Sequence, residues 1–249
     1  AGDVDWSWDY HIMINEFRRH PEICGWLYTE HHDVINEWNG YYKYDRSEKY
    51  TGMSDIVEGM SLKDLHGQFY LASERELCRN VKPGVEVRVP LYASFMTDSA
   101  ASKKLTLRAE LSGWDKLGRY GEYSQYERTI EYSPWVNKEL EPLSVTMPDK
   151  PALAVLSLVL EDGSGCVLHR NFTTYSVSQE QSPREETVAS DAGEVKVVRF
   201  APDSFKNAEW SIKQWNVLDG LKVNGAGAGY FEYSLPWPAD LKVADIAEA

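Results

Sequence analysis

Cysteine is scarce in this sequence, and its three cysteines suggest neither a disulfide framework nor a metal site. Cys24, Cys78 and Cys166 lie far apart, are odd in number and show no CxxC spacing, so they give neither a set of paired disulfides nor a zinc-ligand pattern. Unpaired cysteine behaves as a small apolar residue, and we therefore expect buried free thiols. No metal is expected.

Long apolar runs are also missing. No segment approaches the roughly 20 apolar residues that a membrane helix requires, and the first residues lack the pattern of a signal peptide. These absences predict a soluble protein without a membrane partner and leave its compartment undetermined. Because the sequence starts without Met and ends without a clear terminating element, we expect it to be a slice of a longer protein.

Positive charge is in short supply. The 26 Lys and Arg residues face 39 Asp and Glu residues, which gives a net charge of −13. A surface of this sign repels phosphate, and no basic patch is interleaved with aromatics, so nucleic acid is excluded as a partner. Aromatics, by contrast, are plentiful, with 9 Trp and 15 Tyr. Aromatic faces pack on sugar rings, and this composition therefore suits a neutral polyhydroxylated ligand.

The first 65 residues combine helical patterns with one short apolar run. Apolar residues at helical spacing predict a helix over residues 6–20, which Pro21 ends. Residues 23–28 are apolar and change abruptly into the charged residues 29–33, as a buried strand does when it emerges at a functional rim. Helix and strand together would form one step of a barrel or open α/β sheet. Weak helical patterning returns over residues 53–65.

Between residues 66 and 178 the period of the apolar pattern becomes two. Alternation over residues 85–91 and 105–111 predicts half-buried antiparallel strands. Residues 152–160, a turn at 162–165 and residues 166–175 predict a hairpin. About seven short strands of this rhythm are typical of an immunoglobulin-like β-sandwich, although the Cys-Trp-Cys signature of antibody domains is absent. The predicted fold class is therefore mainly β.

A polar run, SQEQSPREET at residues 178–187, predicts a linker or an exposed loop before a third segment. Residues 188–249 contain an expected strand at 195–200 and a glycine-rich, aromatic stretch around residues 225–229. The spacing GxGxG favours a tight turn or bulge over a phosphate-binding loop. This segment is expected to be a partial accessory β segment that packs on the sandwich or opens a further module.

Residues 18–33, RRHPEICGWLYTEHHD, resemble the last helix-to-strand step of the catalytic barrel in glycoside hydrolase family 2. In that family a His-Pro-x-Ile-x-Gly run leads into an aromatic-rich final strand, and a β-sandwich follows the barrel. Residues 215–233 look like the start of a jelly-roll-like accessory domain of larger members. The resemblance implies that residues 1–65 are the C-terminal remnant of a TIM barrel in a retaining β-galactosidase-like or β-glucuronidase-like enzyme.

Retention of configuration requires two carboxyl groups about 5 to 5.5 Å apart, and in the family both come from earlier strands. The family's acid/base residue follows an Asn, which makes Glu16 and Glu37 candidates, since each follows an Asn. Glu16 lies inside the predicted helix and Glu37 in the loop after the predicted strand, so neither is expected to be catalytic. The resemblance thus places the catalytic residues upstream of this chain and implies no cofactor and no turnover by the chain alone.

What the chain would contribute is a substrate-binding rim. Tyr28 matches by position the aromatic residue that stacks on the sugar in the family's final strand, and packing in a core is the alternative. Residues 29–30 replace the family's usual Trp-Asp, so the resemblance does not identify the sugar. The four residues 30–33 alternate sides in an extended chain and cannot converge on one metal ion, so they are expected to hydrogen-bond to sugar hydroxyls or within the rim. The expected substrate-binding residues are Tyr28, Glu30, His31, His32, Asp33 and Trp38.

Two other readings remain open. The chain could be a non-catalytic carbohydrate-binding or interaction module, or a structural spacer that packs against the missing barrel or other domains. His66 and His169 stand alone in the sequence and are expected to be structural. In the parent enzyme the partner would be a carbohydrate substrate, and the periplasm and secretion are both compatible with such a role.

Overall fold

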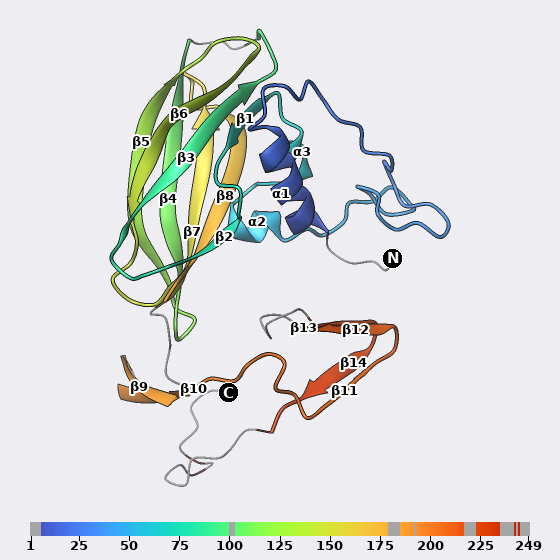
Figure 1. Ribbon diagram of the computed structural model, residues 1–249, viewed down its shortest axis with the longest axis vertical. Coiled ribbons are helices and arrows are strands. Elements are labelled where there is room, and N and C mark those ends of the chain that lie inside the picture. Colours follow the sequence, from blue (N-terminus) through green and yellow to red (C-terminus); the bar gives the residue numbers. More distant parts are fainter. Residues whose placement is uncertain are drawn as a thin grey trace. The chain divides into compact units, whose positions relative to one another are not determined.

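A computed structural model describes residues 6–99, 103–178, 185–191, 193–216, 223–234, 242 and 244. The described residues up to Ser178 belong to one compact unit, and those from Glu185 on belong to a second. Strands dominate both units (Figure 1), which confirms the mainly β class. None of the helices in the described part of the chain is long and apolar enough to cross a membrane.

Eight strands of the first unit form the two sheets of a β-sandwich, which confirms the sandwich expected after residue 66. The smaller sheet has the order β1-β3-β6 and contains β1 (Phe69–Ala72), β3 (Glu86–Phe95) and β6 (Val136–Thr146). The larger sheet has the order β2-β8-β7-β4-β5 and contains β2 (Cys78–Val81), β8 (Val167–Val177), β7 (Ala152–Glu161), β4 (Lys104–Asp115) and β5 (Tyr120–Glu131). All strand neighbours are antiparallel except β2 and β8, which run parallel.

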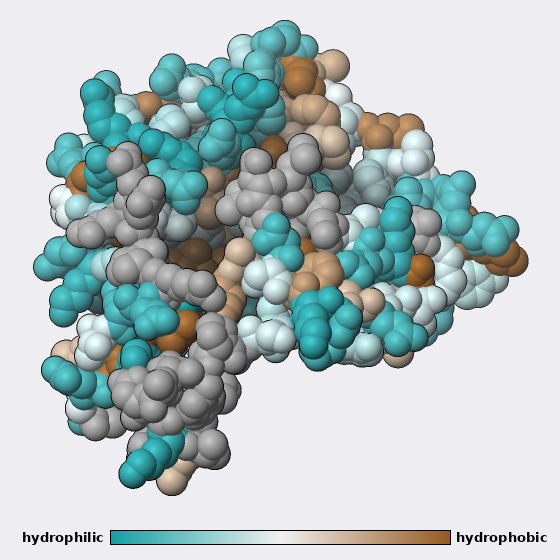
Figure 2. All heavy atoms as spheres, turned by 60° about the horizontal axis from the view of Figure 1, so that its bottom comes forward, coloured by the Kyte–Doolittle hydropathy of each residue, from teal (hydrophilic) through white to brown (hydrophobic). Residues whose placement is uncertain are grey.

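Alternating apolar residues build the sandwich core. On β3, Val89 and Leu91 are buried, and on β4 so are Leu107, Ala109 and Leu111, whereas the residues that alternate with them between these positions are exposed or half-buried. Each such side chain contributes about 1.5–3 kcal/mol when it leaves water. Hydrophilic residues cover much of the described surface in Figure 2, where apolar side chains form small islands. The period of two in the sequence therefore located this core.

The hairpin of β7 and β8 is confirmed, and its turn is stabilised by one carboxylate. Asp162 accepts hydrogen bonds from the backbone N–H of Ser164 at 2.8 Å and of Cys166 at 3.0 Å. Gly165 occupies the left-handed region with a φ of 83°, which costs glycine no steric strain.

Among the described residues before the sandwich, the helices are α1 (Ser7–Phe17), α2 (Met53–Ile56) and α3 (Leu62–Leu65). They confirm the helix expected over residues 6–20 and the weak pattern over residues 53–65. Helix α1 buries Tyr10 and Ile14 in a core that also contains Tyr70 of β1 and Phe172 of β8, and Figure 1 shows it beside the sandwich. A capping box between Ser61 and Asp64 begins α3.

A buried polar hub joins α1 to the larger sheet. The side-chain oxygen of Asn171 on β8 lies 2.5 Å from His11 Nε2, and its amide nitrogen donates to Asn15 Oδ1 at 3.2 Å and to the Leu71 carbonyl at 2.8 Å. Asn15 in turn donates to the Glu74 carbonyl at 2.6 Å. These partners are all buried, so the hub fixes the register of α1 against the sandwich.

The strand expected at residues 23–28 is wrong. This segment runs as irregular chain and pairs with no strand among the described residues. A strand needs a neighbour to satisfy its backbone N–H and C=O groups, and the described residues place none beside it. Trp26 and Tyr28 nevertheless pack inward, whereas Leu27 between them is 88% exposed.

The expectation of buried thiols is also wrong. All three cysteines are free but exposed. Cys24 lies in the irregular segment, Cys78 begins the edge strand β2, and Cys166 lies at the end of the β7–β8 turn. The residues that flank each cysteine in the sequence do not indicate that these positions face solvent.

The described residues of the second unit form three short antiparallel strand pairs. Strand β9 (Glu185–Ser190) pairs with β10 (Gly193–Val198), β11 (Asn207–Trp210) with β14 (Gly229–Glu232), and β12 (Lys213–Asn216) with β13 (Val223–Ala226). Strand β10 confirms the strand expected at 195–200, and Gly227, with a φ of 82°, confirms the turn expected around 225–229. The end of the expected linker is wrong because residues 185–187 belong to β9, and residues 179–184 lie outside the described residues.

Candidate functional site

An aromatic cluster forms where the start of α1 meets the chain that follows it. Its rings are close enough for direct stacking or edge contact, with centroids 5.4 Å apart for Trp6 and Tyr28, 4.5 Å for Tyr28 and Tyr41, and 5.0 Å for Trp6 and Tyr10. The members of the aromatic cluster are Trp6, Tyr10, Trp26, Tyr28, Tyr41 and His66. Because these residues come from four separate segments, the cluster ties the beginning of the chain to the residues just before the sandwich.

The rim loop, residues 29–50, folds back on itself beside this cluster. The Asp33 N–H donates to the Tyr42 carbonyl at 2.9 Å, and the Tyr42 N–H donates to the His31 carbonyl at 3.3 Å. Gly40 permits this approach, because a Cβ there would lie 2.2 Å from the carbonyl carbon of His32.

One buried ion pair holds the rim loop closed. Asp33 Oδ1 accepts from Lys49 Nζ at 2.7 Å and from the Gly40 N–H at 3.0 Å, and Lys49 also donates to the Trp38 carbonyl at 3.0 Å. Both charged side chains are buried. Neither is free to move without leaving the other uncompensated.

Replacement of Asp33 by alanine is expected to open the rim loop. The loss of the ion pair with Lys49 and of the charge-assisted hydrogen bond from the Gly40 N–H should raise the rate of trypsin cleavage after Lys43 or Arg46 about tenfold. Cleavage is followed by mass spectrometry under native conditions. The matched control is Asp149→Ala, an exposed aspartate after β6, which should leave the rate unchanged. Equal cleavage rates in the two variants would mean that the ion pair does not hold the loop.

A pocket of about 680 Å³ opens between the rim loop and residues 51–66. Its lining combines rings, apolar side chains and polar groups, a mixture that is common in sites for small organic ligands. The rings are Tyr41, Tyr42 and Tyr50, the apolar side chains are Met60 and Leu62, and the polar groups include His31, Glu48, Lys49, Lys63 and His66.

The pocket's charges are nearly balanced. Lys49 is neutralised by Asp33, and the remaining lysine, Lys63, shares the lining with the acid Glu48. Glu48 is the one carboxylate among the described residues that line the pocket, so the lining does not hold two carboxyl groups. The described residues also contain no group of three or more His, Cys, Asp or Glu side chains that could hold a metal ion.

The structure places the expected rim residues in three different surroundings. His31 lines the pocket, whereas Tyr28 belongs to the aromatic cluster and donates its hydroxyl to the Asn39 carbonyl. Asp33 is buried in the loop-closing ion pair. The other three rim residues, Glu30, His32 and Trp38, are outside the pocket lining.

The three rim residues outside the pocket lining differ in exposure and in their contacts. A hydrogen bond to Glu37 raises the pKa of the Glu30 carboxyl. Trp38 is 48% exposed, and His32 is half-buried. Sugar contact by these residues stays a prediction.

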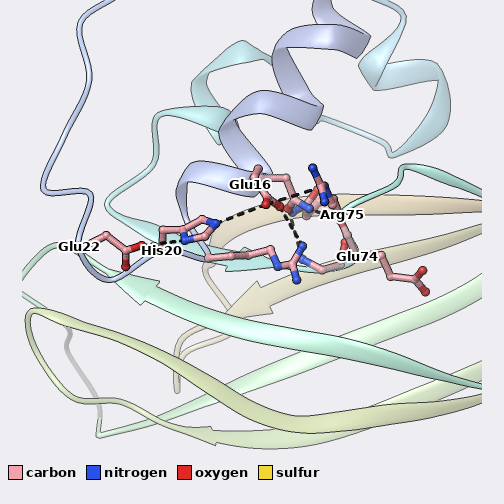
Figure 3. Close-up of polar contacts among 9 residues, drawn as sticks. Glu16, His20, Glu22, Glu74 and Arg75 are labelled. Carbon is pink, nitrogen blue, oxygen red and sulfur yellow. Dashed lines mark hydrogen bonds and ion pairs between the residues drawn. The ribbon is translucent and has the colours of Figure 1, made fainter.

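The two Asn-Glu pairs take up structural positions. Glu16 on α1 is surrounded by basic side chains: Arg19 at 2.9 Å, His20 at 3.3 Å and Arg75 at 3.9 Å (Figure 3). Glu37 follows Asn36, which has a φ of 75° in a tight turn closed by the backbone of residues 34 and 37. Neither carboxylate lines the pocket.

Sequence reasoning missed much of the pocket wall. Tyr50, Lys63 and His66 line it, although His66 was expected to be structural. The available signal was local: the capping box at residues 61–64 starts a one-turn helix that ends at His66, and a chain reversal there brings residues 59–66 back toward the rim loop.

Comparisons with known proteins assign no family. No protein-family model matches the chain, and no curated protein does. Similar solved structures include a cycloisomaltooligosaccharide glucanotransferase from Paenibacillus sp., with 15% identity, a TM-score of 0.30 and coverage of 44% of this chain and 14% of that one. Spo0M, a sporulation control protein from Bacillus subtilis, has 14% identity, a TM-score of 0.31 and coverage of 45% and 49%.

A third is a glycosyl hydrolase family 2 member from Bacteroides cellulosilyticus, with 14% identity, a TM-score of 0.29 and coverage of 52% of this chain and 15% of that one. The matched regions thus span less than half the length of each of these three proteins. The three neighbours are a transferase, a sporulation protein and a hydrolase, and likeness at this level carries no assignment of function.

Proposed function

We propose that this chain is the C-terminal part of a retaining glycoside hydrolase of the family 2 type, and that the pocket beside the rim loop receives a sugar ring. The observation that carries the proposal is the pocket lining, in which three tyrosines and two apolar side chains stand beside several hydrogen-bonding groups. A pyranose ring has the complementary surface, since its C–H face packs on an aromatic ring and its hydroxyls take hydrogen bonds.

The two parts of the first unit have separate roles in this proposal. The sandwich is immunoglobulin-like, because the order β1-β3-β6 matches strands A-B-E and the order β8-β7-β4 matches strands G-F-C of that fold. The helices and the rim loop before it would be what remains of the barrel end, without its last strand because residues 23–28 form none, and the Asn171 hub anchors α1. The accessory segment, residues 188–249, would continue the parent enzyme.

Catalysis would need carboxylates from outside this chain. Double displacement requires a nucleophile and an acid/base about 5 to 5.5 Å apart, and the pocket lining has one carboxylate, Glu48, among the described residues. We expect the chain alone to leave aryl β-glycosides intact in a chromogenic assay. Hydrolysis that disappears on replacement of Glu30 or Glu37 by glutamine would contradict the proposal.

Binding by the chain can be tested directly. Titration with β-linked oligosaccharides, followed by tyrosine and tryptophan fluorescence, is expected to saturate. Tyr42→Ala should weaken binding about tenfold, because one lost stacking contact is worth about 1 to 1.5 kcal/mol. The matched control is Tyr44→Ala, which removes a 65% exposed ring of the same loop that does not line the pocket. A folded chain that shows no saturable binding, or an equal effect of the two variants, would contradict the proposed site.

A non-catalytic carbohydrate-binding module is the second candidate function. It is favoured by the fact that residues 31–66 of this chain supply all of the pocket lining described above. The two functions differ in the activity of the longer protein: an enzyme hydrolyses β-glycosides, whereas a module binds them with no turnover.

A further inference from the structure

His66 lies at the wall of the pocket with its two ring nitrogens in different situations. Nε2 lies 3.1 Å from the Tyr10 hydroxyl. Among the described residues, Nδ1 has no hydrogen-bond partner, and the side chain is exposed on the pocket side. One nitrogen is therefore fixed by the protein while the other is available to a ligand.

The Tyr10 hydroxyl is bonded on its other side to the hydroxyl of Tyr41, which also lines the pocket. Tyr10 itself is buried, and its ring contacts Trp6, Tyr28, Tyr41 and His66 with centroids 5.0 to 5.6 Å away. The three groups form a hydrogen-bond chain, Tyr41–Tyr10–His66, that starts and ends at the pocket wall. We call this chain the relay.

Proton counting limits what the relay can present to a ligand. In one direction, the Tyr41 hydroxyl donates to Tyr10 and the Tyr10 hydroxyl donates to His66 Nε2. The neutral imidazole then carries its proton on Nδ1, so Nδ1 donates into the pocket and the Tyr41 oxygen accepts. If the direction reverses, Nε2 donates to Tyr10, Tyr10 donates to Tyr41, the Tyr41 hydroxyl donates outward and Nδ1 accepts. In both directions the two ends offer one donor and one acceptor.

A ligand with two hydroxyls satisfies both directions, because each hydroxyl can donate or accept. A carboxylate or phosphate offers acceptors alone and leaves the acceptor end of the relay without a partner. Partial burial and the charge of Arg18 lower the pKa of the imidazole, which favours its neutral form. Arg18 stacks on the rings of Trp26 and Tyr70, 4.8 and 4.9 Å from their centroids, so its guanidinium lies behind the cluster.

We infer that the relay recognises two hydroxyl groups of a neutral sugar, with His66 Nδ1 and the Tyr41 hydroxyl as its contact atoms. The inference rests on the proposed sugar pocket and names the ligand class of that site. It assigns direct contact to His66 and Tyr41. Tyr10 is a positioning residue, since it lies behind the pocket wall and acts through its two neighbours.

The test compares neutral and anionic ligands that differ in one group. The probes are the methyl β-glycosides of glucose, galactose and mannose, together with methyl β-glucuronide, and binding is measured by saturation-transfer NMR. The neutral glycoside that binds best should bind at least fivefold more tightly than the glucuronide. His66→Phe should weaken its binding about tenfold. Tyr10→Phe should weaken it about fivefold, although the pocket lining is unchanged. The matched control is His20→Phe, an imidazole on the surface outside the pocket, which should have no effect.

Each outcome decides a separate question. If the wild-type chain binds no glycoside, the sugar pocket and the relay both fail. If it binds but His66→Phe and Tyr10→Phe bind equally well, the pocket stands and the relay fails. Circular dichroism checks that each variant is folded, and if Tyr10→Phe does not fold, His66→Phe still decides the question because its side chain lies at the exposed end of the relay.

Discussion

Replacement of Asn171 by leucine is expected to lower the free energy of unfolding of the first unit by about 3 to 5 kcal/mol. The leucine has a similar size but makes no hydrogen bonds, so His11 Nε2 loses its partner, and Asn15 and the Leu71 carbonyl each lose one bond inside a buried interface. The loss exceeds that of an ordinary hydrogen bond because several buried hydrogen bonds are lost together.

Urea unfolding followed by near-ultraviolet circular dichroism measures this effect, and an unchanged dependence on urea would show that the extent of unfolding is the same. The matched control is Asn80→Leu, which changes an exposed asparagine on the edge strand β2 and should alter the free energy by less than about 0.5 kcal/mol. If both variants lose the same small amount, the hub does not anchor α1. Loss of sugar binding by Asn171→Leu is also expected, because α1 supplies Tyr10 to the relay.

Acid is expected to destabilise the first unit well above the pH at which carboxylates titrate. Burial lowers the pKa of His11 to about 4 and that of His169 to about 3, from an ordinary value near 6.5. Below pH 6.5 the unfolded chain binds protons that the folded chain does not, so stability is complete above pH 6.5 and falls as the pH drops toward 4 and then 3. Between pH 7 and pH 5, the two residues together should lower the free energy of unfolding by about 4 kcal/mol.

The variant that tests this expectation is His169→Phe, which keeps a ring beside Tyr70 and removes one titrating group. Its loss of stability between pH 7 and 5 should be about 2 kcal/mol smaller than that of the wild type. His20 has the opposite effect on the pH dependence of stability. Hydrogen bonds with Glu22 and Glu16 raise the pKa of its imidazole, so its small contribution to stability is present in acid and fades as the pH rises. A wild type and a His169→Phe variant with equal acid sensitivity would contradict the assignment.

Carboxylates with lowered pKa values do not obscure this window. The pKa of Asp115 is lowered by hydrogen bonds from the backbone and side chain of Arg119, against the effect of burial, and that of Asp162 by hydrogen bonds in its turn. Such groups contribute stability that is lost below their ordinary values near 4. His66, whose pKa burial also lowers, adds to the loss between pH 7 and 5 and has the same sign as the two buried histidines.

The sequence was informative wherever one local rule sufficed. Alternation placed the strands of the sandwich because a sheet with one buried face repeats every second residue. Helical spacing and Pro21 placed α1, because the buried face of a helix repeats with the helical period and proline ends the helix. The apolar run at residues 23–28 was ambiguous, because a buried strand and an irregular segment that tucks Trp26 and Tyr28 into a core share the same residues. A neighbouring strand decides between them, and local sequence does not contain it.

The candidate site depends on contacts that are distant in sequence. The sequence predicts Asp33 as an acid at the rim, yet its carboxylate pairs with Lys49 because Gly40 lets the backbone fold over itself. Likewise, His66 becomes a pocket residue through a hydrogen bond to Tyr10, which lies 56 positions earlier. Residue types alone predicted an aromatic, hydrogen-bonding surface, and the loop closure selected which residues form it.

The contact between His11 and Asn171 joins positions that are 160 residues apart. During synthesis, α1 leaves the ribosome long before its anchor on β8 exists, and the loop that closes between them must be ordered late. The pocket wall therefore matures after the last strand of the sandwich has been added. Until then the tyrosines and tryptophans of the aromatic cluster lack this anchor, and apolar surface of that kind is what chaperones bind in unfinished chains.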